Sequence, residues 1–333
     1  MPIKAAINGF GRIGRNILRS AIENNRQDIE IIAINDLASI ETNAHLLKYD
    51  SVHGKFSEQI LIDGNCIKVG DSLIRVTNFK NPEDLPWEDV DIVMECTGIF
   101  TSKELASIYL KSGVKRVLVS APSNGADKTI AYGVNHNVLV KDDIIVSNAS
   151  CTTNCMAPVA KVLHEIVGIK KGFMTTIHSY TGDQPTLDRD HNDLYRARAA
   201  AVNMIPTSTG AARAVGLVLP QLEGKLDGFS IRVPTPNVSC VDLTFESARS
   251  TTAEEINDAM HAAANGSLAS ILGVVDEKLV SMDFIHDSRS SIFATDQTKV
   301  MDKTFCRILT WYDNEWGFSS RMLDTASAIG NLI

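Results

Sequence analysis

IKAAINGFGRIG, residues 3–14, is the stretch that decides how this chain folds. Its apolar first half, Ile3–Asn8, predicts a short buried strand, and apolar residues at helical spacing predict a helix after Gly14. Between them, Gly9 permits a tight turn and Gly11 lets the backbone approach a pyrophosphate, while Gly14 allows the helix to lie close to the strand. The motif alone is weak evidence in a chain with 21 glycines. A strand before it and a helix after it make it a predicted dinucleotide site.

Asp36 supports the same interpretation. It ends a second apolar stretch, Ile29–Asn35, about 20 residues beyond the glycines, where a carboxylate accepts hydrogen bonds from a ribose diol. The helix after the glycines adds free N–H groups and a positive dipole for the phosphates. Because a carboxylate repels a 2′-phosphate, we expect NAD rather than NADP.

The rest of the first half continues the alternation of strands and helices. Strands are expected at Val90–Thr97, Val114–Ala121 and Ile144–Ser147, with a helix at Ser102–Ser112. This alternation predicts an α/β fold whose parallel sheet is wrapped on both faces, a Rossmann-type dinucleotide-binding domain over residues 1–150.

After residue 150 the pattern becomes rich in strands and predicts an α+β domain with a mostly antiparallel or mixed sheet. The expected strands are Gly172–His178, Phe229–Val233, Val238–Glu246 and Thr304–Asp313, and the expected helices are Thr252–Ala264 and Leu323–Asn331. Residues 183–201 form a long polar stretch, and loops of that length inside a domain are usually functional.

Composition excludes several classes of protein. The 333 residues include 44% hydrophobic and 22% charged ones, an ordinary globular balance, with a net charge of −8 and no basic run to bind nucleic acid. No apolar run is long enough to span a membrane, and the residues at the N-terminus argue against a secretory leader. Six scattered cysteines fit a reducing compartment. We therefore expect a cytoplasmic protein without a nucleic-acid or membrane partner.

SNASCTTNC, residues 147–155, is the most informative stretch for chemistry. Ser, Asn and Thr before an apolar-periodic run predict a helix N-terminus, with Cys151 in the first turn. There the helix dipole is expected to lower the pKa of the thiol and make it a nucleophile. Cys155, four residues on, is expected to be a buried neighbour, and no further ligands at suitable spacing support a metal site. An isolated buried cysteine without function is the alternative.

A nucleophilic thiol needs a base. His178 ends an expected strand, and strand ends meet helix N-termini in a two-layer domain. From the residues alone it leads only modestly over His53, His136, His164 and His191, because any single histidine is more often structural.

Five strings together resemble the phosphorylating glyceraldehyde-3-phosphate dehydrogenases, and the likeness runs from residue 3 to the C-terminus. They are NGFGRIGR (8–15), SNASCTTNC (147–155), PTSTGAA (206–212), RVPTPN (232–237) and WYDNEWG (311–317). The resemblance implies oxidative phosphorylation of D-glyceraldehyde 3-phosphate with NAD and inorganic phosphate. Cys151 would form a thiohemiacetal and then a thioester, with His178 as general base.

The resemblance also implies the binding residues. Cofactor contacts would come from Gly9, Gly11, Arg12, Ile13, Gly14, Asp36, Ser120 and Asn314, the last holding the nicotinamide carboxamide. Thr181 and Arg232 would hold the substrate phosphate, and Ser150, Thr152, Arg196, Thr209 and Gly210 the inorganic phosphate. It further implies a catalytic domain over 151–318, a C-terminal helix (319–333) that returns to the first domain, and a homotetramer with the 183–201 loop at a subunit interface.

Three positions depart from the family pattern. Arg189 stands in the segment that reaches the adenosine end of a neighbouring cofactor and could accept a 2′-phosphate, which opposes the preference set by Asp36. Phe318 replaces a common Tyr, and Gly182 follows Thr181 where Asn is usual. Two alternatives stay open: an erythrose-4-phosphate dehydrogenase, and a non-catalytic NAD-binding protein. The retained Thr181, Thr209 and Gly210 favour the triose phosphate.

Overall fold

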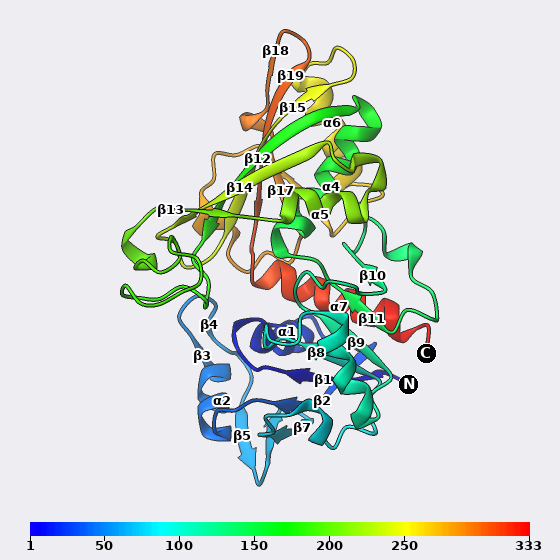
Figure 1. Ribbon diagram of the computed structural model, residues 1–333, viewed down its shortest axis with the longest axis vertical. Coiled ribbons are helices and arrows are strands. Elements are labelled where there is room, and N and C mark those ends of the chain that lie inside the picture. Colours follow the sequence, from blue (N-terminus) through cyan, green and yellow to red (C-terminus); the bar gives the residue numbers. More distant parts are fainter. The chain divides into compact units, whose positions relative to one another are not determined.

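The computed structural model describes residues 1–333, which fold into two compact units (Figure 1). Unit 1 comprises Met1–Tyr132, His136–Ala149 and Ser319–Ile333, and unit 2 comprises Gly133–Asn135 and Ser150–Phe318.

Unit 1 is built on a nine-stranded sheet in the order β10-β11-β9-β8-β1-β2-β7-β6-β5. The strands are β1 (Ile3–Asn8), β2 (Ile29–Asn35), β5 (Ile60–Asp63), β6 (Cys66–Val69), β7 (Ser72–Thr77), β8 (Ile92–Glu95), β9 (Arg116–Val119), β10 (Lys128–Thr129) and β11 (Ile145–Ser147). The helices are α1 (Arg12–Glu23), α2 (Ile40–Lys48) and α3 (Lys103–Ala106), and β3 (Tyr49–Asp50) pairs with β4 (Gly54–Lys55) outside the sheet.

Strand β1 is the centre of this sheet, paired in parallel with β2 on one side and β8 on the other. Its residues Ala5, Ala6 and Ile7 have no exposed surface, as a strand covered on both faces requires. Because the chain runs outward in opposite directions from β1, the carboxyl ends of β1 and β8 form a topological switch point. Ligands bind at such points in open α/β sheets.

Unit 2 is built on an eight-stranded mixed sheet, in which the path β13-β14-β12-β15-β19-β17-β16 is joined by β18. The strands are β12 (Ile169–Ser179), β13 (Ile205–Ser208), β14 (Leu226–Val233), β15 (Ser239–Ser247), β16 (Leu272–Val275), β17 (Ser291–Ala294), β18 (Lys299–Met301) and β19 (Phe305–Tyr312). Its helices are α4 (Cys151–Ile166), α5 (Ala211–Val218) and α6 (Ala253–Ala264), which contact the sheet strands (Figure 1). Helix α7 (Trp316–Gly330) ends the chain.

The expected α/β class is confirmed, and two expectations about unit 1 are corrected. The sheet is not wholly parallel, since β7, β6 and β5 form antiparallel hairpins at one edge. The helix expected at Ser102–Ser112 is α3 followed by a 3₁₀ segment, Ser107–Ser112, that ends at Gly113 with φ +90°. The tighter turn directs Tyr109 into the core, where its hydroxyl reaches Glu95.

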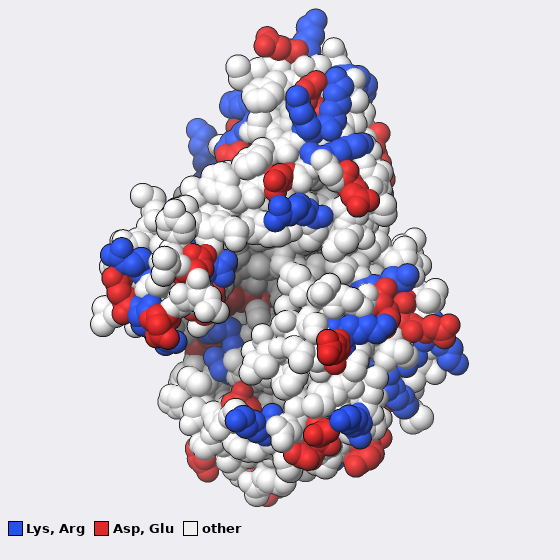
Figure 2. All heavy atoms as spheres, viewed as in Figure 1, with Lys and Arg blue, Asp and Glu red and all other residues white.

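No helix of the chain combines the length and the apolar character that crossing a membrane requires. On the face shown in Figure 2, basic and acidic side chains are interspersed rather than gathered by sign.

Candidate active site

The glycine turn after β1 has the geometry that its sequence predicts. Gly9 has φ +89°, and a Cβ there would lie 2.7 Å from the backbone of Cys96 and Thr97. A Cβ on Gly14 would overlap the carbonyl oxygen of Gly9, whereas one on Gly11 would meet nothing within 4 Å. Gly9 and Gly14 are therefore required for packing. Gly11, at the N-cap of α1, leaves open space where a ligand can approach the backbone.

A cavity of about 480 Å³ lies at the carboxyl ends of β1, β2 and β8. Its lining residues are Asn8, Gly9, Gly11, Asn35, Asp36, Leu37, Phe79, Lys80, Asn81, Cys96, Thr97, Ile99 and Phe100. Asp36 accepts hydrogen bonds from the backbone N–H of Phe10 (2.7 Å) and Ala38 (2.9 Å), so this carboxylate also fixes the glycine turn. The size suits part of a dinucleotide, and the open space at Gly11 together with Asp36 fits the group predicted from the sequence.

The buried carboxylate of Glu95 binds two residues of the cavity lining, Asn8 and Thr97, and the sequence did not predict this role. Its Oε1 accepts the backbone N–H of Thr97 (2.7 Å) and the Thr97 hydroxyl. Its Oε2 accepts the Tyr109 hydroxyl and the Asn8 amide (3.3 Å). Four donors satisfy both oxygens, as burial of a carboxylate requires.

The other predicted cofactor residues of unit 1 lie outside the cavity lining. Arg12 forms an ion pair with the buried carboxylate of Asp50 at 2.5 Å, and Ile13 is half-buried on α1. Ser120 follows β9, and its backbone N–H donates to the carbonyl of Glu95 (3.0 Å).

In unit 2 the structure brings Cys151 and His178 together. Cys151 is the first residue of α4, and the side chain of the N-cap residue Ser150 accepts the backbone N–H of Thr153 at 3.0 Å. His178 lies near the end of β12, and its Nε2 is 3.5 Å from the Cys151 sulfur. His178 Nδ1 lies 2.7 Å from the carbonyl oxygen of Ser179. A carbonyl only accepts, so the Nδ1 proton is fixed there and the Nε2 lone pair faces the thiol.

Burial decides the protonation of this pair. It raises the pKa of the Cys151 thiol, and the Arg232 guanidinium and the Thr152 N–H oppose it only in part. Burial also lowers the pKa of His178 to about 3, and Arg232 acts in the same direction. Both groups are therefore neutral near pH 7, with the proton on sulfur. The thiol pKa is therefore raised and not lowered as expected, because the loss of water outweighs the charge of Arg232 and the hydrogen bonds of the first helical turn.

Two arginines and a carboxylate lie beside this pair. Arg232 is the register partner of His178 on the parallel neighbour β14, and its Nη1 donates to the Thr181 hydroxyl at 2.8 Å. Arg196 donates to Asp183 at 3.0 Å, and the Thr181 hydroxyl donates to the same carboxylate. Thr181, Arg196 and Arg232 thus form one group around Asp183. A second anion held there would compete with Asp183 for the same donors.

The residues expected to bind the inorganic phosphate are only partly brought together. Thr209 and Gly210 precede α5, where the Thr209 hydroxyl accepts the backbone N–H of Ala211 (3.2 Å). Helices α4 and α5 are in contact at these ends, since the Thr153 hydroxyl donates to the carbonyl of Ala211 (3.5 Å). The Thr152 hydroxyl, in contrast, is buried against the Tyr312 hydroxyl (2.8 Å) and does not face an opening.

Asn314, between β19 and α7, is held firmly in unit 2. Its Oδ1 accepts hydrogen bonds from the hydroxyls of Ser179 (2.8 Å) and Ser239 (2.9 Å). The preceding residue, Asp313, accepts the N–H groups of Glu315 and Trp316 and thereby fixes the start of α7.

Comparisons with known proteins agree with this geometry. Residues 3–103 match the family profile "Glyceraldehyde 3-phosphate dehydrogenase, NAD binding domain", and residues 150–314 match "Glyceraldehyde 3-phosphate dehydrogenase, C-terminal domain". Relatives named glyceraldehyde-3-phosphate dehydrogenase include proteins of Cereibacter sphaeroides (66% identical) and Xanthobacter flavus (64%), each over 100% of both chains. One from Geobacillus stearothermophilus is 51% identical over 99% of both. The chain belongs to the glyceraldehyde-3-phosphate dehydrogenase family.

Membership of the glyceraldehyde-3-phosphate dehydrogenase family confirms the predicted resemblance, fold class and NAD-binding character. The NAD-binding match includes the glycine turn and Asp36 but ends before Ser120. The C-terminal match spans Ser150 to Asn314 and therefore every predicted site residue of unit 2.

Several residues that shape these sites were missed from the sequence. Thr97 and Phe79 follow the carboxyl ends of β8 and β7, and a position after a parallel strand is the signal that could have drawn attention to them. Ser179 and Ser239 had no such signal, since serines in strands are common and their partner Asn314 is far away in the sequence.

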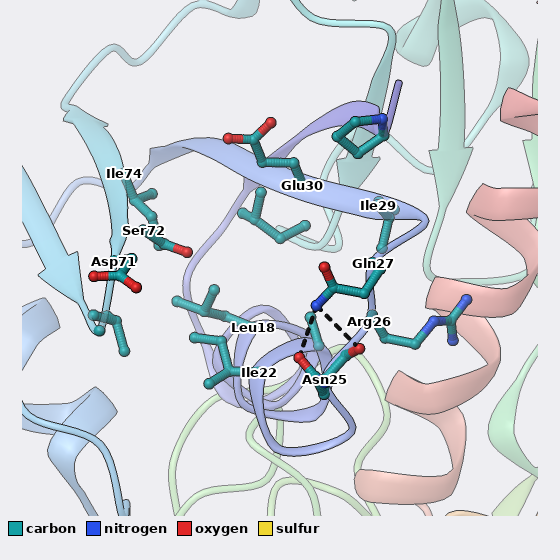
Figure 3. A pocket seen from close by; sticks show the side chains of 15 residues that line it. Leu18, Ile22, Asn25, Arg26, Gln27, Ile29, Glu30, Asp71, Ser72 and Ile74 are labelled. Atoms are coloured by element: carbon teal, nitrogen blue, oxygen red, sulfur yellow. Dashed lines mark hydrogen bonds between the residues drawn. The ribbon is translucent and has the colours of Figure 1, made fainter.

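A second hollow in unit 1, of about 370 Å³, lies at the opposite, amino-terminal ends of the strands (Figure 3). Leu18, Ile22 and Ile74 contribute to its apolar lining. Gln27 and Asn25 also line it, and the Gln27 side chain donates to the Asn25 side chain (2.7 Å). No predicted site residue lines it.

Proposed function

We propose that this chain catalyses the oxidative phosphorylation of D-glyceraldehyde 3-phosphate to 1,3-bisphosphoglycerate with NAD and inorganic phosphate. The observation that carries the proposal is the 3.5 Å contact between the Cys151 thiol and the His178 Nε2 lone pair, next to the Arg232 guanidinium. A nucleophile, a fixed base and an anion site in one place are what an aldehyde phosphate requires.

The reaction starts from the neutral pair. His178 Nε2 takes the thiol proton while the Cys151 sulfur bonds to the aldehyde carbon, and the carbonyl oxygen takes a proton from the imidazolium to give a thiohemiacetal. His178 then removes that hydroxyl proton as the hydride leaves the carbon, which makes the thioester. Bound NAD supplies the hydride acceptor. A phosphate oxygen finally attacks the thioester carbon, and the Cys151 thiolate leaves as the acyl phosphate forms.

The binding residues are proposed as follows. In unit 1 the open backbone at Gly11 accommodates the pyrophosphate at the N-terminus of α1, and Asp36 binds the adenosine ribose. The remaining proposed cofactor residues are Gly9, Arg12, Ile13, Gly14, Ser120 and Asn314. For Arg12 to cover the pyrophosphate, it has to share its guanidinium with Asp50.

For the two phosphates we propose an arrangement that follows the contacts. Thr181 and Arg232 hold the substrate phosphate, and Asp183 turns away when it binds. Arg196 lies against the same carboxylate, so it contributes to both anion sites. The inorganic phosphate is bound by Ser150, Thr209, Gly210 and the backbone of Thr152 at the adjoining starts of α4 and α5.

We further propose that residues 1–150 with 319–333 form the NAD-binding domain and 151–318 the catalytic domain. A homotetramer in the cytoplasm completes the proposal. An apolar part of the unit 2 sheet supports self-association: Phe173 on β12 and Phe229 on β14 are 51% and 37% exposed, with ring centroids 5.9 Å apart. Six free cysteines fit a reducing compartment.

The test follows absorbance of the reduced nicotinamide with glyceraldehyde 3-phosphate, NAD and inorganic phosphate, for the wild type and Cys151→Ser. Phosphate-dependent NADH formation that disappears in Cys151→Ser is the expected result. NADP and erythrose 4-phosphate are run in parallel: better turnover with NADP would mean that the exposed Arg189 outweighs Asp36, and preference for the erythrose phosphate would replace the proposed substrate. A folded protein that binds NAD without any turnover would contradict the enzymatic proposal.

A further inference from the structure

Ser179, at the end of β12, is fully buried and contacts both the proposed base His178 and the proposed cofactor residue Asn314. Its carbonyl oxygen accepts the Nδ1 proton of His178 at 2.7 Å and a hydrogen bond from Arg232 at 3.3 Å. Its hydroxyl donates to Asn314 Oδ1 at 2.8 Å. One residue therefore holds the base through its backbone and the amide through its side chain.

Ser239, the first residue of β15, closes a ring with these groups and is 1% exposed. Its Oγ accepts the backbone N–H of Ser179 at 3.0 Å. A backbone N–H can only donate, so the hydroxyl proton of Ser239 is directed elsewhere. Asn314 Oδ1, at 2.9 Å, is a closer acceptor for it than the Ser179 Oγ, at 3.4 Å. The ring thus has a defined direction, in which both serine hydroxyls donate to the same oxygen.

The ring decides what Asn314 offers to a ligand. A side-chain amide oxygen has two lone pairs, and both are used by the two serines. The Nδ2 group makes no hydrogen bond within the protein, so it is the only part of the amide still able to bind. If the amide were flipped, Nδ2 would face two hydroxyls and Oδ1 would face the ligand, at the cost of the ring's direction.

We propose that Ser179 and Ser239 are positioning residues that hold Asn314 as a hydrogen-bond donor toward the carbonyl oxygen of the nicotinamide carboxamide. This inference rests on the proposed function, because the carboxamide is the ligand assigned to Asn314. Ser179 also connects Asn314 to His178. Its backbone carbonyl fixes the tautomer of His178, and its hydroxyl fixes the amide of Asn314, which orients the cofactor.

The test uses the full-length enzyme with Ser179→Ala, Ser239→Ala and the double variant. Ser247→Ala is the matched control: Ser247 ends the same strand β15, is fully buried and donates to the carbonyls of Arg249 and Thr304. The probes are NAD and 3-acetylpyridine adenine dinucleotide, which keeps the carbonyl oxygen but lacks the amide N–H groups. Melting temperatures and the rate of Cys151 alkylation by iodoacetamide are measured for every variant.

In the double variant we expect KM for NAD to rise about tenfold, with a smaller change in kcat. KM for the acetylpyridine analogue should rise by more, because a flipped Asn314 can still accept from the NAD carboxamide but has nothing to accept from an acetyl group. Alkylation should stay at the wild-type rate, since alanine leaves the carbonyl that holds His178. Ser247→Ala should leave both KM values unchanged.

Equal KM increases for the two dinucleotides, or no increase beyond that of Ser247→Ala, would overturn the inference. If the wild type shows no phosphate-dependent turnover, the proposed function fails separately. In that case the dissociation constants of the same two dinucleotides, measured by quenching of tryptophan fluorescence, test the ring without turnover. The quantity compared is the ratio of the dissociation constant for the acetylpyridine analogue to that for NAD. A ratio that differs between the double variant and the wild type supports the inference, and an unchanged ratio overturns it.

Discussion

His178 gives the clearest single-residue consequence. The unfolded chain titrates this imidazole near its ordinary pKa of 6.5, whereas burial lowers its pKa to about 3 in the folded protein. Below pH 6.5 the unfolded state therefore binds the proton and the folded state does not, so stability is complete above 6.5 and is lost as pH falls toward 3. At pH 5 the loss through this residue is about 2 kcal/mol.

Urea unfolding of the wild type and His178→Gln at pH 7 and pH 5 measures this effect. The glutamine variant should lose about 2 kcal/mol less than the wild type between the two pH values. Identical losses would show that His178 is already protonated in the folded protein at pH 5 and would contradict the lowered pKa.

At the scale of elements, the turn between β1 and α1 separates packing from binding. Gly14→Ala places a Cβ against the carbonyl of Gly9, and overpacking of that kind costs about 1–3 kcal/mol. Gly11→Ala meets nothing within 4 Å, so it should change the free energy of unfolding by less than about 0.5 kcal/mol while weakening NAD binding several-fold. Thermal melts and NAD titrations of both variants check this. Equal stability loss in the two would contradict it.

The N-terminus of α4 gives a second prediction at this scale. Ser150→Ala removes the hydroxyl that accepts the Thr153 N–H, which costs about 1 kcal/mol and loosens the turn that carries Cys151. Alkylation of Cys151 should slow several-fold. Thr252→Ala is the control, since Thr252 caps α6 by the same kind of bond (3.1 Å to the Glu255 N–H). It should cost similar stability and leave alkylation unchanged. Slower alkylation in both variants would mean a general loosening.

At the scale of the whole molecule, a feature was predicted from the sequence when it depends on residues that are close together in the chain. The strand Ile3–Asn8, the glycine turn and the N-terminal position of Cys151 rest on neighbouring residues, and the structure has them as expected. The hairpins of β5, β6 and β7 were missed because their partly exposed residues, such as Leu61 and Ile62, do not alternate in polarity.

Contacts across long sequence separations were mostly missed, because no pattern of neighbouring residues indicates them. Asn314 meets Ser179 across 135 positions, and the Arg232–His178 pairing follows from the parallel register of β14 and β12. The prediction of a lowered pKa for the Cys151 thiol was wrong for the same reason. A helix start is a local feature, but the loss of water that raises the thiol pKa comes from the surrounding fold.

Self-association is the property of the molecule that the apolar part of the unit 2 sheet predicts. A tetramer of 36.2 kDa chains has a mass of about 145 kDa, which analytical ultracentrifugation measures. The double variant Phe173→Asp/Phe229→Asp places two carboxylates in the proposed interface, where a buried, unpaired charge is costly. It should therefore sediment as a smaller species, with a fold that circular dichroism shows to be unchanged.

Leu105→Asp is the control. Leu105 is 49% exposed on α3 in unit 1, so this variant should keep the wild-type mass. A wild type that sediments as a single chain at micromolar concentration would contradict the homotetramer. A double variant that keeps the full mass would mean that this part of the sheet is not where the copies meet.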